Sequence, residues 1–151
     1  MTKEPTRTNK ATILTELIRS VFPLNGRLLD AGDRLSGDVG LSSALWQVLG
    51  AIADNPRSVS QISRVMGLTR QSVQRSVNIM ETDGLVEFIP NPDHKTSPLV
   101  QMTSKGQSAF RKVMRLQIDW SNDLAKNFKT DELKVAARVL RSFLDALEIR
   151  E

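Results

Sequence analysis

The chain has 151 residues, a length typical of one domain and sufficient for a hydrophobic core without disulfides or metal clusters. It contains no cysteine, which excludes disulfides, thiolate redox chemistry and cysteine-ligated zinc, and no apolar run approaches the roughly 20 residues of a membrane span. The net charge of +4 is weak support for an acidic partner, and the polar first ten residues lack the apolar segment of a signal peptide, so we expect a cytoplasmic protein.

A heptad pattern of apolar residues occupies the N-terminal part of the chain and predicts a long helix. Its positions follow steps of three and four: Leu14, Leu17, Val21, Leu24, Leu28, Ala31 and Leu35. Pro23 lies inside the pattern and removes one backbone hydrogen bond, which predicts a kink. Gly37 and Gly40 end the segment.

Three shorter helices are predicted next. The first opens at Ser42 or Ser43, with Leu45, Trp46, Leu49 and Ile52 on one side. The second begins with a capping-box spacing of Ser58 and Gln61 and buries Val59, Ile62 and either Val65 or Met66. The third spans residues 69–82 after a turn at Gly67, with Thr69 as its cap, Val73, Val77 and Met80 facing inward, and Gly84 at its end.

The pattern then changes to two short β-prone runs, residues 85–89 and 99–102. The segment 90–98 between them contains three prolines, which predicts the exposed tip of a hairpin. Thr103 restarts a helix, and we expect Thr130 to cap the last one. That helix carries a second heptad pattern, formed by Leu133, Ala137, Leu140, Leu144 and Leu147.

Two helices joined by a tight turn and followed by a hairpin predict a winged helix-turn-helix within a mainly α fold with a small β-wing. In such a motif the second helix, here residues 69–82, enters the major groove of duplex DNA. At about 100° per residue, the side opposite Val73 carries four residues suited to base edges: Gln71, Gln74, Arg75 and Asn78. Any solvated helix face is polar, but this one has neither Glu nor Lys, and no acidic residue occurs between Asn55 and Met80.

Further residues are candidates for contact with phosphates. Thr69, Arg70 and Ser72 lie at the start of the recognition helix, where hydroxyls and free backbone N–H groups favour a phosphate oxygen. Arg57 and Arg64 precede it as candidate phosphate contacts, with a solvated surface as the close alternative. The predicted hairpin tip supplies His94 and Lys95 as candidates for contact with the minor groove or the backbone. For His94 it is an equal alternative that the residue is exposed on the loop and has no function.

As a set, several segments resemble the MarR family of bacterial regulators. The matching segments are residues 41–49, 68–73, 83–86, 91–95 and 99–106, and the likeness covers nearly the whole chain. The resemblance implies a winged helix-turn-helix regulator, often a repressor released by a small aromatic or phenolic ligand. At Thr96 many relatives carry arginine, so Lys95 is left as the cation of the wing tip.

The two heptad patterns and the resemblance together predict a homodimer, with packing of both patterns within one subunit as the alternative. Residues 1–40 and 104–151 would form the helical dimerisation region and residues 41–103 the DNA-binding region. A two-fold dimer predicts a pseudo-palindromic site with half-sites roughly 34 Å apart. Trp46 and Met114 could line a ligand cleft, but apolar residues at helical spacing are more often core.

Other function classes fit less well. The chain has one histidine, no cysteine and no tyrosine, and it contains no phosphate-binding glycine loop or metal-ligand spacing. We therefore expect no catalytic, cofactor-binding or metal-ligating residues, and the chain is not predicted to be an enzyme. The alternative is a winged-helix module that binds a protein or RNA partner; it predicts apolar residues on the outer face of the recognition helix, where only Ile79 comes close.

Overall fold

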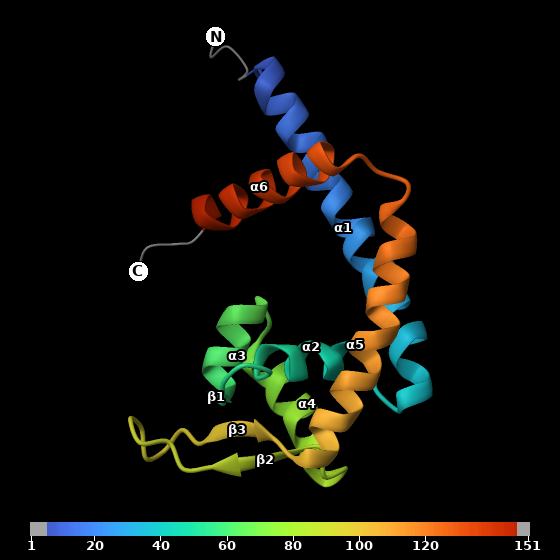
Figure 1. Ribbon diagram of the computed structural model, residues 1–151. Helices are drawn as coiled ribbons and strands as arrows, with labels where there is room; N and C mark the ends of the chain where they lie inside the picture. Colours follow the sequence, from blue (N-terminus) through green and yellow to red (C-terminus); the bar gives the residue numbers. More distant parts are fainter. Residues whose placement is uncertain (1–5, 148–151) are drawn as a thin grey trace. The chain divides into compact units, whose positions relative to one another are not determined.

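The computed structural model describes residues 6–147, which divide into two compact units at the bond between Val113 and Met114 (Figure 1). The first unit contains α1 (Asn9–Ser36), a 3-10 turn η1 (Gly37–Val39), α2 (Ser43–Ala51), β1 (Arg57–Ser58), α3 (Val59–Met66), α4 (Arg70–Thr82), β2 (Val86–Ile89), β3 (Leu99–Met102) and the first part of α5 (Ser104–Ala125). The second unit contains the rest of α5 and α6 (Thr130–Leu147). The ends of the expected dimerisation region, residues 1–5 and 148–151, lie outside the described residues.

One hydrophobic core holds the first unit together. Its fully buried apolar side chains come from α2, α3, α4, α5 and the sheet: Val48, Leu49, Ile62, Val73, Val77, Met80, Val100 and Val113. Val59 packs against this core. The sequence pattern left open whether Val65 or Met66 faces inward: Met66 packs against the core, whereas Val65 is 59% exposed. Trp46 is partly buried and also packs on the core, as expected of an apolar residue at helical spacing.

The short helices begin and end where local chemistry predicts. Ser42 caps α2 by accepting a hydrogen bond from the backbone N–H of Leu45. Ser58 and Gln61 form both hydrogen bonds of the predicted capping box at the start of α3. Gly67 has a left-handed backbone, φ 62°, that ends α3 and turns the chain into α4. The helix-turn-helix is therefore specified largely by its own capping residues.

The sheet has three strands rather than the two expected. The hairpin of β2 and β3 is present, with Phe88 opposite Val100. In addition, β1 pairs antiparallel with β3, with Arg57 opposite Val100. The sequence pattern missed β1 because a strand of two residues has no alternation to recognise, and its pairing depends on residues far along the chain.

The start of α5 is joined tightly to the end of α4. The backbone N–H of Thr103 donates to the carbonyl of Leu85 at 3.0 Å, and its hydroxyl donates to the carbonyl of Gly84 at 2.7 Å. Lys105 donates through Nζ to the carbonyl of Asp83 at 2.6 Å. Gly106 packs so closely that a Cβ built on it would lie 2.0 Å from the Leu85 carbonyl oxygen. These contacts fix where α4 ends relative to the first part of α5.

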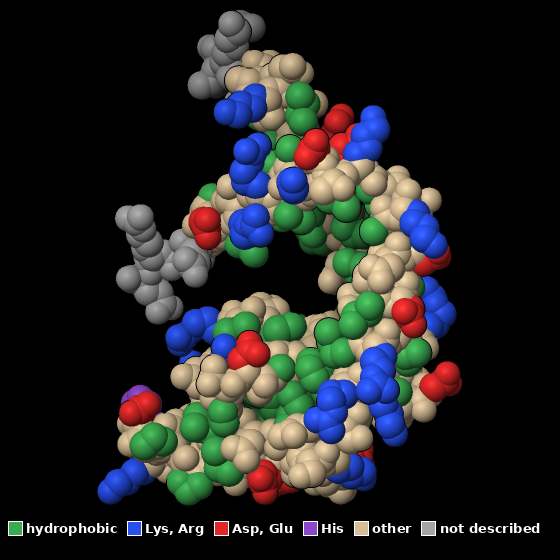
Figure 2. Space-filling view, in the orientation of Figure 1, with side chains coloured by type: hydrophobic (Ala, Val, Ile, Leu, Met, Phe, Trp, Pro, Cys, Tyr) green, Lys and Arg blue, Asp and Glu red, His purple; other side chains and the backbone are tan. Residues whose placement is uncertain are grey.

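The terminal helices expose their apolar residues instead of burying them. Along α1, which continues through Pro23, Leu14, Leu17, Val21, Leu24 and Leu28 of the first heptad pattern are each 40–51% exposed. None of the 18 residues of α6 is buried, and Leu144 and Leu147 are 71% and 72% exposed. Hydrophobic side chains are visible at the surface over both helices (Figure 2).

The predicted cap of α6 is wrong by one position. Thr130 is the first helical residue, and Lys129 stands at the cap: its carbonyl accepts the first helical hydrogen bond, from Leu133. The carboxylate of Glu132 accepts from the backbone N–H of Lys129 at 3.2 Å, so an acidic side chain in the first turn does the capping that we assigned to the threonine hydroxyl. No helix among residues 6–147 is long and apolar enough to cross a membrane.

Candidate nucleic-acid interface

Helix α4 presents a polar outer face, as predicted. Val73, Val77 and Met80 are completely buried and fix the orientation of the helix on the core. The predicted base-contacting and helix-start residues are all exposed: Thr69, Arg70, Gln71, Ser72, Gln74, Arg75 and Asn78. No acidic residue lies in the first turn, so the positive end of the helix dipole is uncompensated there. An anion at this end would be stabilised by the dipole and by free backbone N–H groups.

The hydroxyls at the start of α4 are engaged within the chain. Thr69 Oγ1 accepts a hydrogen bond from the backbone N–H of Ser72 at 3.1 Å, which confirms Thr69 as the helix cap. The Ser72 hydroxyl donates to the Thr69 carbonyl at 2.9 Å. The Ser72 hydroxyl proton is therefore used within the chain, whereas an incoming phosphate could accept from free backbone N–H groups, from Arg70 and from the Thr69 hydroxyl, which here only accepts.

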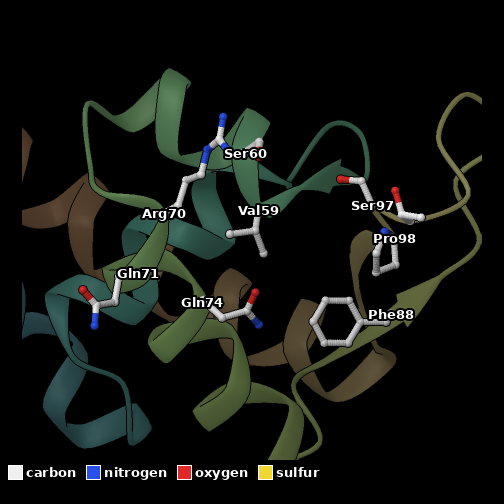
Figure 3. A pocket seen from close by; sticks show the side chains of 9 residues that line it. Val59, Ser60, Arg70, Gln71, Gln74, Phe88, Ser97 and Pro98 are labelled. Atoms are coloured by element: carbon white, nitrogen blue, oxygen red, sulfur yellow. The ribbon is translucent and has the colours of Figure 1, made fainter.

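A groove separates α4 from the wing, which we define as residues 85–102. Its volume is about 380 Å³. Helix α3 contributes Val59 and Ser60 to its lining, α4 contributes Arg70, Gln71 and Gln74, and the wing contributes Phe88, Thr96, Ser97 and Pro98 (Figure 3). The α4 side of the groove is thus polar and basic, whereas the wing side combines the ring of Phe88 and the proline with the hydroxyls of Thr96 and Ser97.

A second groove, of about 540 Å³, lies between α3 and the tip of the wing. Arg64 from α3 and His94 from the wing tip both line it, so the fold brings together two candidates that are 30 positions apart in the sequence. Asp93 also lines this groove and places one carboxylate beside the two basic side chains.

The wing tip is held by its own hydrogen bonds. Asn91 Nδ2 donates to the carbonyl of Ser97 at 2.7 Å, and the backbone N–H of Asp93 donates to Asn91 Oδ1 at 3.0 Å. The backbone N–H of Ser97 donates to the carbonyl of His94 at 3.1 Å. The closed loop leaves the Lys95 side chain exposed.

Arg57 is placed differently from the other basic candidates. Its guanidinium Nη1 donates a hydrogen bond to the carbonyl of Ala51, at the C-terminal end of α2, and the residue is half-buried. This contact ties β1, the edge strand of the sheet, to the last turn of α2. The geometry therefore gives Arg57 a structural contact that the sequence pattern did not reveal, because the partner is a backbone carbonyl.

Comparison with known proteins identifies the family. The MarR family model matches residues 39–95, the segment that contains α2, α3, α4 and most of the wing. The chain is 34% identical over 135 residues to uncharacterized protein Rv2011c of Mycobacterium tuberculosis, with 89% of this chain and 94% of that protein covered. The chain belongs to the MarR family.

Solved structures share the same fold. The transcriptional regulator BldR from Sulfolobus solfataricus superposes with a TM-score of 0.82 at 18% identity, covering 93% of this chain and all of that one. A mutant MarR from E. coli, solved in complex with operator DNA, superposes with a TM-score of 0.72 at 23% identity and covers 93% of this chain and 99% of that one. The winged helix-turn-helix predicted from the sequence is therefore confirmed.

Within this MarR-family fold, sequence reasoning missed the residues that α3 and the wing add to the groove. Ser60, Phe88 and Ser97 line it with α4, although none was a candidate. Ser60 lies in the first turn of α3, between the two residues of the capping box, and this place could have indicated a polar side chain that is not part of the core. Phe88 and Ser97 carried no such pattern, because their positions follow from the register of the hairpin.

Proposed function

We propose that this chain is a sequence-specific, DNA-binding transcriptional regulator. The observation that carries the proposal is the exposed, polar outer face of α4, with no acidic residue from Arg70 to Met80, beside a groove shared with the wing. An α-helix fits the major groove, which is about 12 Å wide, and side chains on its outer face reach base edges there. The relative solved with operator DNA supports this assignment by its fold.

In this proposal, α4 contacts bases through Gln71, Gln74, Arg75 and Asn78. Arg75 would donate to guanine O6 and N7, and an amide would pair with adenine N6 and N7. The groove between α4 and the wing would receive one sugar-phosphate strand, since Arg70 and the start of α4 both favour an anion there.

The wing, including residues 90–98, would contact the next stretch of the duplex. Lys95 is exposed at the tip and would lie against phosphates or the minor groove, whose negative potential attracts cations. Arg64 and His94 line a common groove and would contact the same strand of the backbone. Arg57 would support the interface from behind by holding β1 on α2.

We further propose that the functional form is a homodimer, with residues 1–40 and 104–151 as its dimerisation region and residues 41–103 as its DNA-binding region. Support comes from the exposed leucines of α1 and α6, because apolar surface in water costs about 25 cal/mol per Å². A two-fold dimer would bind a pseudo-palindromic site with half-sites roughly 34 Å apart.

We also propose that the bound dimer represses the promoter it covers, because it would exclude polymerase from the same stretch of duplex. A small aromatic ligand would release it. A groove of about 580 Å³ between the end of α2, β3 and α5 supports such a ligand, with Ile52, Met102 and Phe110 as apolar lining and Gln107 and Arg111 as polar lining. Titration with benzoate as a probe should raise the melting temperature and weaken DNA binding; no change at about 10 mM would remove this ligand class.

The proposal is tested by a mobility-shift titration of the full chain at several salt concentrations. Genomic fragments selected for binding are compared with a duplex of scrambled sequence. The logarithm of the association constant should fall linearly with the logarithm of salt, with a slope of about −0.9 per neutralised phosphate, and the selected fragments should bind at least about 1,000-fold more tightly. A chain that retards no duplex at low salt, but binds an RNA or a protein, would contradict the assignment.

A further inference from the structure

Two amide side chains on the outer face of α4 are joined to each other. Gln74 Nε2 donates a hydrogen bond to Asn78 Oδ1 at 2.8 Å. Among the described residues of α4, this is the one hydrogen bond between two side chains. Both residues are exposed, so the bond is not a consequence of core packing. Its effect is to orient two groups that would otherwise rotate freely.

The two residues do not face the same way. At about 100° per residue, Asn78 lies about 140° from the buried Val73, near the middle of the outer face, whereas Gln74 lies only about 100° away. Gln74 is on the flank that lines the groove between α4 and the wing, together with Arg70 and Gln71 (Figure 3). Asn78 does not line that groove. Asn78 is thus placed for a base edge and Gln74 for the neighbouring backbone.

The hydrogen bond also restricts how the Asn78 amide is presented. With Gln74 as the donor, the Asn78 oxygen faces Gln74, and turning the Asn78 amide over by itself would bring two N–H groups together. One lone pair of Asn78 Oδ1 is then occupied, and the second lone pair and both Nδ2 hydrogens remain free. An acceptor and a donor side by side match adenine, which offers an N6 donor and an N7 acceptor. Guanine offers two acceptors and would set O6 or N7 against the amide oxygen.

Gln74 keeps one hydrogen on Nε2 after binding Asn78, and its side chain borders the groove. A phosphate oxygen in that groove would accept this hydrogen. We infer that Asn78 recognises one adenine of the operator, and that Gln74, instead of contacting a base itself, is a positioning residue that joins the Asn78 amide to the adjacent phosphate. The inference rests on the proposed function and adds to it the base and the residue pair that select that base.

The test measures base preference at every operator position. The full-length wild type and the variants Asn78→Ala, Gln74→Ala, the double variant and Gln71→Ala are titrated against the selected operator and its single-base-pair substitutions. Asn78→Ala should reduce discrimination at one A·T pair by about 5- to 150-fold. Gln74→Ala should reduce discrimination at that same pair, and the double variant should lose no more there than Asn78→Ala, because Gln74 acts through Asn78.

Gln71→Ala is the matched control, since it removes an exposed amide from the same face without breaking the pair. Because Gln71 is itself a proposed base contact, its loss should change preference at another base pair and leave preference at that A·T pair unchanged. Losses that add in the double variant, or a Gln74→Ala effect at a different base pair, would overturn the inference while leaving the regulator intact. A wild type that prefers no duplex over any other would instead overturn the proposed function itself. Circular dichroism checks that each variant is folded.

Discussion

The helix-turn-helix with its wing and the terminal helices use apolar side chains in opposite ways. Between Leu41 and Met102, the apolar residues that set the helix faces are buried, and the polar residues of α4 are left outside. In α1 the leucines of the heptad pattern are exposed from Leu14 to Leu28, although Ala31 is buried and Leu35 partly buried, and α6 has no buried residue at all. The first region buries its apolar residues within one chain, and the second leaves apolar side chains exposed. An exposed polar face and an exposed apolar face call for different experiments.

The largest effect, on the dimer dissociation constant, is expected from placing a charge in the heptad pattern of α6. Leu140→Asp should raise the dimer dissociation constant at least about 100-fold, because each copy loses roughly 1.5–3 kcal/mol of burial and a two-fold interface contains two copies. Sedimentation equilibrium measures the dissociation constant. DNA affinity should fall with it, since a monomer contacts one half-site.

The matched control for that variant is Ser142→Asp, which adds the same charge two positions along the same exposed helix. It should leave the dimer intact, because Ser142 is outside the heptad pattern. Equal dissociation by both variants would mean that charge alone disperses the dimer. If Leu140→Asp stays a dimer, the exposed α6 leucines serve another purpose and the contrast between the two regions fails.

The next effect tests how closely the first region packs against the first turn of α5. Gly106→Ala puts a Cβ 2.0 Å from the carbonyl oxygen of Leu85, so the joint between α4 and α5 must shift. Overpacking of this kind costs roughly 1–3 kcal/mol, which should lower the melting temperature by several degrees. Thermal unfolding followed by circular dichroism measures it.

Gly50→Ala is the comparison, because Gly50 is also helical but a Cβ there would meet nothing within 4 Å. That variant should gain about 0.5–1 kcal/mol from the better helix propensity of alanine. A loss of folding stability in Gly106→Ala together with a gain in Gly50→Ala would confirm the close approach of α5 to Leu85. A Gly106→Ala protein as stable as the wild type would show that the joint gives way easily.

What the sequence could predict depends on how far apart the interacting residues are. The caps Ser58 and Thr69 and the inward residues of α4 depend on neighbours a few positions away and were found; Ser42 was found as one of two alternatives, and the cap of α6 was placed one position late. The strand β1 and the Arg57 bond to Ala51 depend on where distant or backbone groups come to lie, and neither was found. The wing side of the groove was missed for the same reason, because Phe88 and Ser97 are placed by the hairpin register.

Within the first region, Arg75→Ala should separate base contact from backbone contact. Arg75 is exposed in the middle of the outer face of α4 and would donate to a guanine, so its loss should cost about 1–3 kcal/mol of specific affinity and relax preference at one base pair. Titration against the operator and its substitutions measures both quantities. An equal loss on every duplex would make Arg75 a phosphate contact instead.

The smallest effect is expected from Lys95 at the wing tip, for which Arg57 of β1 is the matched basic residue. Lys95 is exposed on a loop closed by its own hydrogen bonds, whereas Arg57 is half-buried and bonded to Ala51. Lys95→Ala should weaken binding by a similar factor on all sequences and make the salt dependence shallower by about 0.9 for each wing that contacts a phosphate. Arg57→Ala should leave the slope unchanged and cost about 0.5–1.5 kcal/mol of folding stability, because it removes a contact within the chain. If the slope changes for Arg57→Ala and stays the same for Lys95→Ala, the two roles are exchanged, and the strand β1 rather than the wing tip lies against the DNA backbone.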